Sequence, residues 1–268
     1  MPAGLSDLGE YRPPLIDMHS IHLYTASENH YENATAPLAA ERAIEVASGL
    51  IDLARVENKI TSSQPRPTIC FDEWNVWLPT RAPGSKGAEE TYTLSDALAV
   101  GVWLNVFVRK SRDVGMACIA QSVNVISPLI TTKAGIIKQS IWSPYELFCK
   151  YMAGHTISCH LSCDEYEGST KPDWIRGAKE TPWLDVSATV DENGWVGLFV
   201  VNIHEEESIT THIHGCHGKV QVFTVTGSDL RVNNMAGKEE VGIKESIWNA
   251  ESAYVFPKHS MTLLRWKA

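Results

Sequence analysis

The sequence predicts an α/β region followed by an all-β region. Residues 15–152 contain short apolar strands that alternate with longer helical patterns, which is typical of parallel β/α units. Residues 153–268 contain short strands separated by turns and no convincing helix, which is typical of an antiparallel β-sandwich. A chain of 268 residues is long enough for one large domain or two smaller ones, each with its own core. We therefore expect two parts with these bounds, and residues 1–14 stay unassigned.

Local patterns place the elements of the α/β part. In chain order, we expect a strand at 16–24, a helix at about 37–60, a strand at 68–73, a helix at about 94–112 and a strand at 115–121. Pro37 suits the start of the first helix, because its fixed φ is already helical. That helix carries an apolar stripe made of Ala43, Val46, Leu50 and Leu53. Thr93 and Asp96 predict a capping box at the start of the second helix.

The β-sandwich part is predicted from strands and turns alone. The expected strands are 185–190, 195–203, 210–213, 220–225 and 254–266. Cys159 and Cys163 could form a bridge or stay free thiols, and their spacing leaves both alternatives open. A group of metal-ligand residues lies between two strands: His212, His214, Cys216 and His217. Because glycines interrupt this group, a turn is the better interpretation, and we predict no metal site.

Composition narrows the class of partner. The net charge of -9 and the absence of a basic stripe argue against nucleic acid. No apolar run approaches the roughly 20 residues that a membrane span needs. The first residues show neither the basic region nor the apolar core of a signal peptide, so a cytoplasmic location is expected, with secretion as the alternative if the true N-terminus is missing. The sequence leaves the oligomeric state open, a homo-oligomer included.

Polar side chains gather at the ends of the three predicted parallel strands. The first strand places His22 and Tyr24 on one face, since they are two residues apart. The second ends at Glu73, with Trp77 just beyond it. Barrel enzymes place their sites at such strand ends. A carboxylate there can attack the anomeric carbon of a sugar, and an indole can cover the sugar's face. The function therefore depends first on Glu73.

The neighbouring groups refine this prediction. The third strand ends at Gln121, and Asn124 follows in the next loop. Asp72 precedes Glu73 directly, so strand alternation predicts that their side chains point to opposite faces. On that basis we do not expect the two carboxylates to act together as a catalytic pair.

Three segments in order resemble a known enzyme family. They are residues 22–24 (HLY), 71–77 (FDEWNVW) and 120–126 (AQSVNVI). Together they resemble the α-L-arabinofuranosidases of glycoside hydrolase family 51, the fungal branch most closely. The resemblance implies a (β/α)8 barrel packed against a β-sandwich, with residues 15–152 as the last three β/α units. It also implies a retaining glycosidase that acts on arabinose-containing oligosaccharides or polysaccharides and needs no cofactor.

The resemblance also implies a role for each candidate residue. Glu73 would be the nucleophile, at the end of the seventh barrel strand. His22 and Tyr24 would end the sixth strand and form hydrogen bonds near the nucleophile. Trp77 would pack on the arabinose. Gln121, from the eighth strand, would bind its hydroxyls, and Asn124 would contribute to substrate binding.

One required group is missing from the pattern. A retaining glycosidase needs a second carboxyl group about 5–5.5 Å from the nucleophile, and the family has it after an asparagine at the end of the fourth strand. No Asn-Glu pair precedes Glu73, and Glu28 and Glu32 are poor substitutes because they lie in a loop. We therefore expect the C-terminal part of a longer enzyme, inactive as this chain. The alternatives are a non-catalytic sugar-binding or interaction protein and a related glycosidase with another sugar preference.

Overall fold

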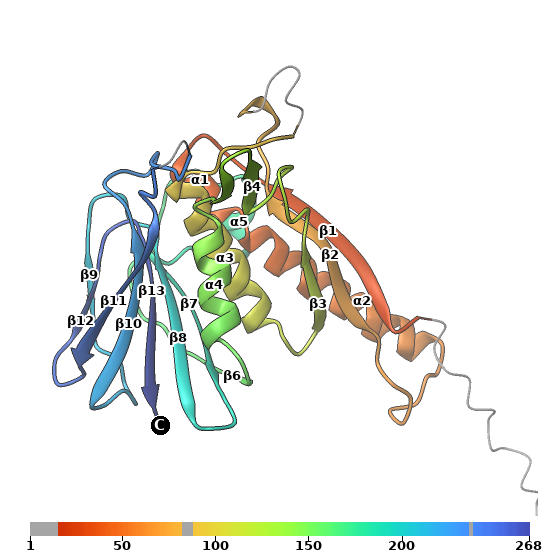
Figure 1. The fold of residues 1–268 in the computed structure, drawn as a ribbon. Helices are drawn as coiled ribbons and strands as arrows, with labels where there is room; N and C mark the ends of the chain where they lie inside the picture. Colours follow the sequence, from red (N-terminus) through yellow and green to blue (C-terminus); the bar gives the residue numbers. More distant parts are fainter. Residues whose placement is uncertain (1–15, 82–87, 236–237) are drawn as a thin grey trace, which may run out of the picture.

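A computed structural model describes residues 16–81, 88–235 and 238–268. The expectations for residues 1–14, including the absence of a signal peptide, lie outside the described residues. Figure 1 shows a small parallel sheet and a larger antiparallel sheet with helices between them.

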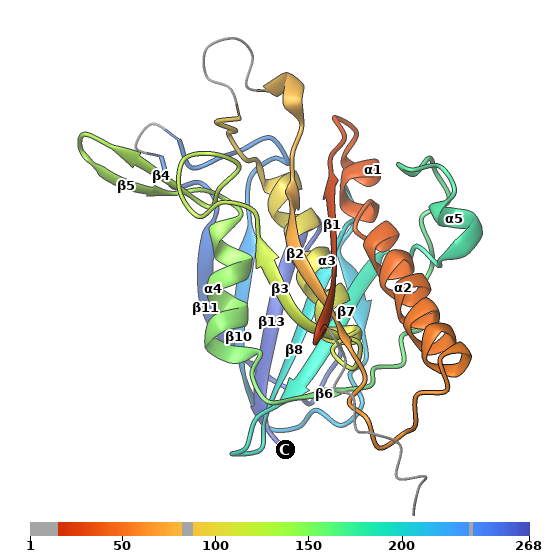
Figure 2. The ribbon, with the colours of Figure 1, turned by 90° about the vertical axis from the view of Figure 1, so that its right-hand side faces the viewer.

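The first part is an α/β unit built on three parallel strands. Its elements are β1 (Met18–Thr25), α1 (His30–Thr35), α2 (Leu38–Glu57), β2 (Thr68–Val76), a short 3-10 turn (Pro79–Arg81), α3 (Leu94–Arg109), β3 (Val114–Ile119), β4 (Leu129–Thr132), β5 (Gly135–Lys138) and α4 (Trp142–Tyr151). The parallel sheet has the order β1-β2-β3, and Figure 2 shows the three strands side by side. This confirms the three predicted strands and both long helices. The β4–β5 hairpin and the short helix α1 were not predicted.

The start of α3 confirms the predicted capping box. The Thr93 hydroxyl accepts from the Asp96 amide, and the Asp96 carboxylate accepts from the Thr93 amide at 2.8 Å. These bonds satisfy two amides that the helix itself leaves without partners. Asp96 is fully buried and also receives the Arg81 guanidinium, so the helix start is tied to the loop that follows β2.

The second part is antiparallel. Its elements are β6 (His155–Ile157), α5 (Ile175–Ala178), β7 (Leu184–Val190), β8 (Trp195–Asn202), β9 (Ile209–Thr211), β10 (Lys219–Thr226), β11 (Gly242–Asn249), β12 (Tyr254–Phe256) and β13 (Ser260–Lys267). Six strands form one sheet in the order β11-β10-β13-β8-β7-β6, and β12 pairs with β9 in a second sheet. The prediction missed β6, the short helix α5 and β11, and the single strand predicted at 254–266 is wrong.

The break between β12 and β13 has a local cause. Pro257 has no amide hydrogen for a sheet ladder, and His259 adopts a left-handed backbone with φ 34°. The Asn202 side chain donates to the carbonyls of Phe256 and Pro257, at 3.2 and 2.9 Å, and so holds the turn between the two strands.

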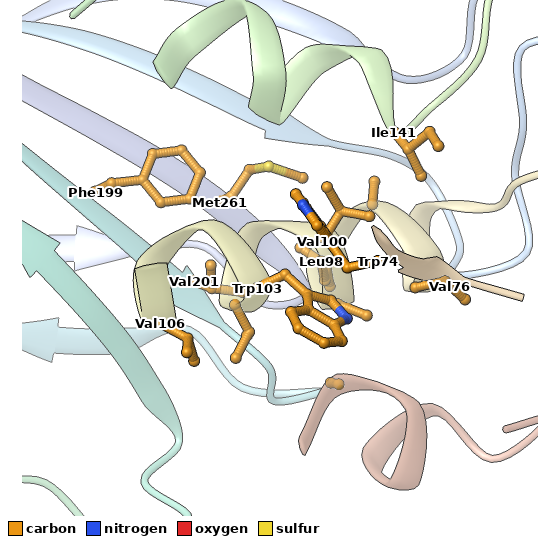
Figure 3. Packing of buried hydrophobic residues seen from close by; sticks show 14 of the residues in the cluster. Trp74, Val76, Leu98, Val100, Trp103, Val106, Ile141, Phe199, Val201 and Met261 are labelled. Carbon is orange, nitrogen blue, oxygen red and sulfur yellow. The ribbon is translucent and has the colours of Figure 1, made fainter. Parts of the chain in front are cut away.

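Helix α3 lies between the two sheets and forms the main core. On one side Trp103 stacks near Trp74 and Phe71, with ring centroids 5.2 and 5.4 Å away. On the other side Gly101 lies so close to the six-stranded sheet that an added Cβ would be 3.0 Å from the Val201 side chain. Figure 3 shows Trp74, Trp103 and Val201 together with Phe199 and Met261 of that sheet. One hydrophobic core thus joins both parts.

The other face of the six-stranded sheet has a core of its own. Along β8, Phe199 and Val201 face the helices, whereas Val196 and Val200 face the β9–β12 pair. The buried residues of this second cluster include Leu184, Val220, Val222, Phe256, Leu264 and Trp266. This layer of sheet on sheet is the sandwich that the sequence predicts.

Part of the α/β unit has an exposed apolar surface. Ile44 of α2 is buried against the core, but three residues of the predicted stripe are exposed: Val46 (48%), Leu50 (59%) and Leu53 (52%). Within the described ranges β1 pairs only with β2, and β3 pairs only with β2, so both edges of the parallel sheet are free. Parallel sheets are normally covered on both faces. The α/β unit therefore offers surfaces that a complete fold of this kind would bury.

Candidate active site

A β-bulge in β2 places both carboxylates on the same face of the parallel sheet. Phe71 and Trp74 are three residues apart, yet both pack on Phe107 of α3. The two residues between them therefore share the opposite, exposed face, and the register between β1 and β2 shifts at this point. The expectation that Asp72 and Glu73 point to opposite faces is wrong, because one extra residue interrupts the alternation.

Three side chains on the exposed face of β1 lie next to these two carboxylates. They are Ser20, His22 and Tyr24, which are spaced two residues apart. Ser20 donates a hydrogen bond to Asp72, and the His22 Nδ1 lies 3.7 Å from the same carboxylate. Tyr24 donates its hydroxyl to the Glu73 Oε1. Burial raises the pKa of Tyr24 above its usual range, and the hydrogen bond to Glu73 and its negative charge raise it further. Tyr24 therefore stays a hydrogen-bond donor to Glu73.

Trp77 completes the group around Glu73. Its ring lies edge-on to the Tyr24 ring, with centroids 5.3 Å apart at 70°. The Trp77 amide donates to the Thr25 carbonyl at 3.0 Å, which continues the pairing of β1 with β2 beyond the strand. The structure thus brings Tyr24, Glu73 and Trp77 together, as their spacing in the sequence suggests.

Buried polar groups fix the backbone at the end of β2 through hydrogen bonds. Asn75 is fully buried and donates to the Ile126 carbonyl at 2.7 Å. The Tyr92 hydroxyl, also buried, donates to the Val76 carbonyl at 2.8 Å. Buried polar groups are costly unless paired, so these contacts fix the backbone that carries Glu73 and Trp77.

The remaining candidates, Gln121 and Asn124, lie in the segment that follows β3. Gln121 is exposed just beyond β3 and has a left-handed backbone with φ 54°. The adjacent Ala120 amide donates to the Trp74 carbonyl at 3.0 Å, which places Gln121 beside the end of β2. The Asn124 side chain instead accepts from the Thr131 amide at 2.8 Å. Asn124 therefore shapes the loop before the β4–β5 hairpin, and its side-chain oxygen is engaged by Thr131.

Comparisons with known proteins decide the family. Residues 72–260 match the family described as "Alpha-L-arabinofuranosidase C-terminal domain". The chain belongs to this family. Over 263 residues it is 68% identical to the probable alpha-L-arabinofuranosidase C of Aspergillus terreus and to alpha-L-arabinofuranosidase C of Emericella nidulans. Each match covers 98% of this chain and 52% of the relative.

Solved structures agree. The arabinose complex of the Thermotoga maritima alpha-L-arabinofuranosidase has a TM-score of 0.80 at 25% identity, and the match covers 94% of this chain and 53% of that one. The GH51 enzyme of Thermotoga petrophila gives 0.80 at 26% identity, with 94% and 53% covered. The chain thus corresponds to the C-terminal portion of the family 51 α-L-arabinofuranosidases that it matches, and it spans about half the length of these relatives.

Two polar residues near this site, Ser20 and Glu90, were not predicted from the sequence. Ser20 could have been found, because it shares the face of His22 and Tyr24 at the same spacing of two. Glu90, which contacts the backbone just beyond Trp77, carries no local signal, because a long loop separates it from β2.

Three further observations concern the cysteines, metal-ligating groups and membrane-spanning helices. All six cysteines are free thiols, Cys159 and Cys163 included. No three histidine, cysteine or acidic side chains in the described ranges lie close enough together to hold a metal ion. In the same ranges no helix has the length and apolar character needed to cross a membrane.

Proposed function

We propose that this chain carries the nucleophile of a retaining α-L-arabinofuranosidase and that Glu73 is that nucleophile. The single observation that carries the proposal is the Tyr24–Glu73–Trp77 group at the ends of parallel strands, in a chain of this family. Because the chain spans about half of its relatives, the activity is that of a longer or assembled enzyme.

The geometry suits the first step of such a reaction. Glu73 would attack the anomeric carbon of a terminal α-L-arabinofuranosyl residue and form a covalent glycosyl-enzyme, while a second carboxyl group protonates the departing oxygen. That second group would then activate water, which releases arabinose and restores Glu73. The Tyr24 hydroxyl donates to the Glu73 Oε1 and so restrains the carboxylate that would make this attack.

The remaining candidates would bind the sugar. Trp77 lies beside the nucleophile with its ring half-buried, so its free area can cover a sugar face. His22 and Gln121 would contact hydroxyl groups, and Asn124 would act through the shape of its loop. The substrates would be arabinan, arabinoxylan or their oligosaccharides. A relative 34% identical over 152 residues, from Halalkalibacterium halodurans, is named an intracellular exo-alpha-(1->5)-L-arabinofuranosidase.

The exposed surfaces support a (β/α)8 barrel in the complete enzyme. A barrel of this kind has about 250 residues and eight parallel strands without free edges, whereas this unit has three strands with two free edges. A preceding strand would pair with β1, and a preceding helix would cover Leu50 and Leu53 of α2. We propose that the half of the relatives absent from this chain supplies these elements and the second carboxyl group.

Fragment complementation tests the proposal. The chain is mixed with the separately expressed N-terminal half of the Emericella nidulans relative, and aryl arabinofuranosides, xylosides and galactosides are supplied. We expect the two pieces to associate and to release arabinose only. Glu73→Ala should retain association and lose at least about 10³-fold in turnover, as expected for a nucleophile. Glu28→Gln, an exposed carboxylate in the loop after β1, serves as the matched control.

Two outcomes would contradict different parts of the proposal. More than about 1% residual turnover in Glu73→Ala would remove Glu73 from the nucleophile's role. If Leu50→Asp left the association of the two pieces unchanged, the proposal that a helix of the N-terminal half covers α2 would be wrong. Ile247→Asp, which changes an exposed apolar residue of β11 (63%), is the control for that arm.

The missing second carboxyl group favours one alternative, a sugar-binding protein without catalysis. In that case the chain alone would bind arabinose-containing polymers through Trp77. Binding by the wild type without hydrolysis, lost in Trp77→Ala, would support this alternative.

A further inference from the structure

Glu90 is a buried carboxylate outside the group described above. Its side chain is fully buried, and its Oε1 accepts a hydrogen bond from the Leu78 amide at 3.0 Å. Within the described part of the chain its Oε2 has no partner. This carboxylate is removed from water for one hydrogen bond to the backbone and an ion pair with Arg81 at 3.9 Å, which is costly unless these contacts serve a purpose.

The backbone of Glu90 is fixed independently of that contact. The Glu90 backbone carbonyl accepts a hydrogen bond from the Gln139 Nε2 at 3.1 Å. The Gln139 Oε1 in turn accepts from the Tyr92 backbone amide at 3.0 Å. The same Gln139 amide donates to the Ser127 carbonyl at 2.8 Å. Glu90 is thus presented from an anchored segment, and the loop after β2 is the part that its side chain holds.

The contact lies one residue from Trp77. The Trp77 amide is bound to Thr25 on one side, and the Leu78 amide is bound to Glu90 on the other. These two bonds fix both peptide units that flank the Trp77 Cα, and the Trp77 ring then meets Tyr24, the donor to Glu73.

We propose that Glu90 is a positioning residue that sets the Trp77 ring beside Tyr24 through the Leu78 amide. What the ring does for the substrate rests on the proposed function. The placement itself does not, because it follows from contacts within this chain.

The charge of Glu90 should affect this placement. The pKa of Glu90 is raised to about 7, mainly by burial; the Asp96 carboxylate acts in the same direction, whereas the Leu78 amide, the Arg81 guanidinium and Tyr92 act against the rise. Arg81 lies 3.9 Å from Oε1, on the loop itself, and Tyr92 is the other titratable neighbour. An ionised acceptor binds an amide more strongly than a neutral one. The Leu78 contact therefore strengthens as pH rises through neutrality.

The test is ¹⁹F NMR of the chain labelled with 5-fluorotryptophan, with the Trp77 resonance assigned by its absence in Trp77→Phe. We expect Glu90→Ala to move this resonance by more than its linewidth and to leave those of buried tryptophans such as Trp103 in place. Glu89→Ala, a change of the exposed neighbour, should move none. In the wild type the Trp77 resonance should titrate near neutral pH, and Glu90→Gln should abolish the titration.

The outcomes decide the proposal without any measurement of turnover. An unmoved Trp77 resonance in Glu90→Ala overturns it, as does a neutral titration that persists in Glu90→Gln. His22→Asn is the control for an effect of the His22 imidazole on the Trp77 resonance. Removing this imidazole should leave the pH dependence of the resonance unchanged. If Glu90→Ala does not fold, Glu90→Asp, which keeps the charge but shortens the side chain, should still shift the resonance. Failed complementation would overturn the proposed function and leave these results standing.

Discussion

Acid should destabilise this protein through His30, a buried histidine at the junction of its two parts. His30 lies in α1 and is 8% exposed. Its Nε2 donates to the Ile203 carbonyl at 2.8 Å, and its Nδ1 lies 2.8 Å from the Ser95 hydroxyl. Because a carbonyl only accepts, the neutral ring with hydrogen on Nε2 satisfies both contacts. Protonation would place a charge inside the core.

The magnitude follows from the pKa. The pKa of His30 is lowered from 6.5 to about 4, mainly by burial; His259 acts in the same direction, and the Ile203 contact acts against the change. Between these values the unfolded chain binds more protons than the folded one. Stability that is present above pH 6.5 is therefore lost as pH falls towards 4. At 1.36 kcal/mol per unit the loss is about 3 kcal/mol, a large part of the 5–15 kcal/mol typical of a domain.

The assay is urea unfolding at pH 7 and pH 4, followed by tryptophan fluorescence, for the wild type and His30→Gln. Glutamine can make both hydrogen bonds but does not titrate. We expect it to lose about 3 kcal/mol less between the two pH values. The comparison is needed because Glu90, with its raised pKa, changes stability in the opposite direction between pH 4.5 and about 7. Equal pH dependence in both proteins would refute the reasoning, and exposed His155→Gln is the control.

Two further predictions concern stability at neutral pH, measured by the same unfolding assay. Gly49 of α2 has no atom within 4 Å of an added Cβ, so Gly49→Ala should stabilise the helix by about 0.5–1 kcal/mol. Gly101→Ala in α3 should instead cost about 1–3 kcal/mol, since its Cβ would meet Val201 at 3.0 Å, and an equal effect of both changes would contradict the packing. Arg109→Met should cost about 3–5 kcal/mol, because it leaves Asp185 buried and charged without its partner. A loss below about 1 kcal/mol would show that this carboxylate is neutral or hydrated.

Much of the fold could be predicted because the signals are local. The start of α3 follows from Thr93 and Asp96, which act within one helical turn. The strands that carry Tyr24 and Glu73 follow from short apolar runs between turns. β11 was missed because four successive residues in it are exposed and its apolar alternation is weak.

What could not be predicted depends on distant partners. The bulge at Asp72 and Glu73 is set by the register against β1 and by the fit of Phe71 and Trp74 to α3, neither of which is visible in the strand alone. The link from Glu90 to Leu78 joins segments separated by a loop. Periodicity also could not show which of two apolar faces of α2 would be buried, because both are apolar.

The position of α3 has a consequence for the reaction proposed at Glu73. This helix is packed against both sheets, and its Asn105 side chain donates to Asp185 at 2.7 Å across the junction. Arg109 on the same helix binds Glu41 of α2 and Asp185 of β7 together. These contacts tie the sandwich to the parallel sheet, so we expect the two parts to move together. Because Glu73 lies on the exposed face of the parallel sheet, the proposed reaction should depend on the loops at the strand ends and not on closure of one part over the other.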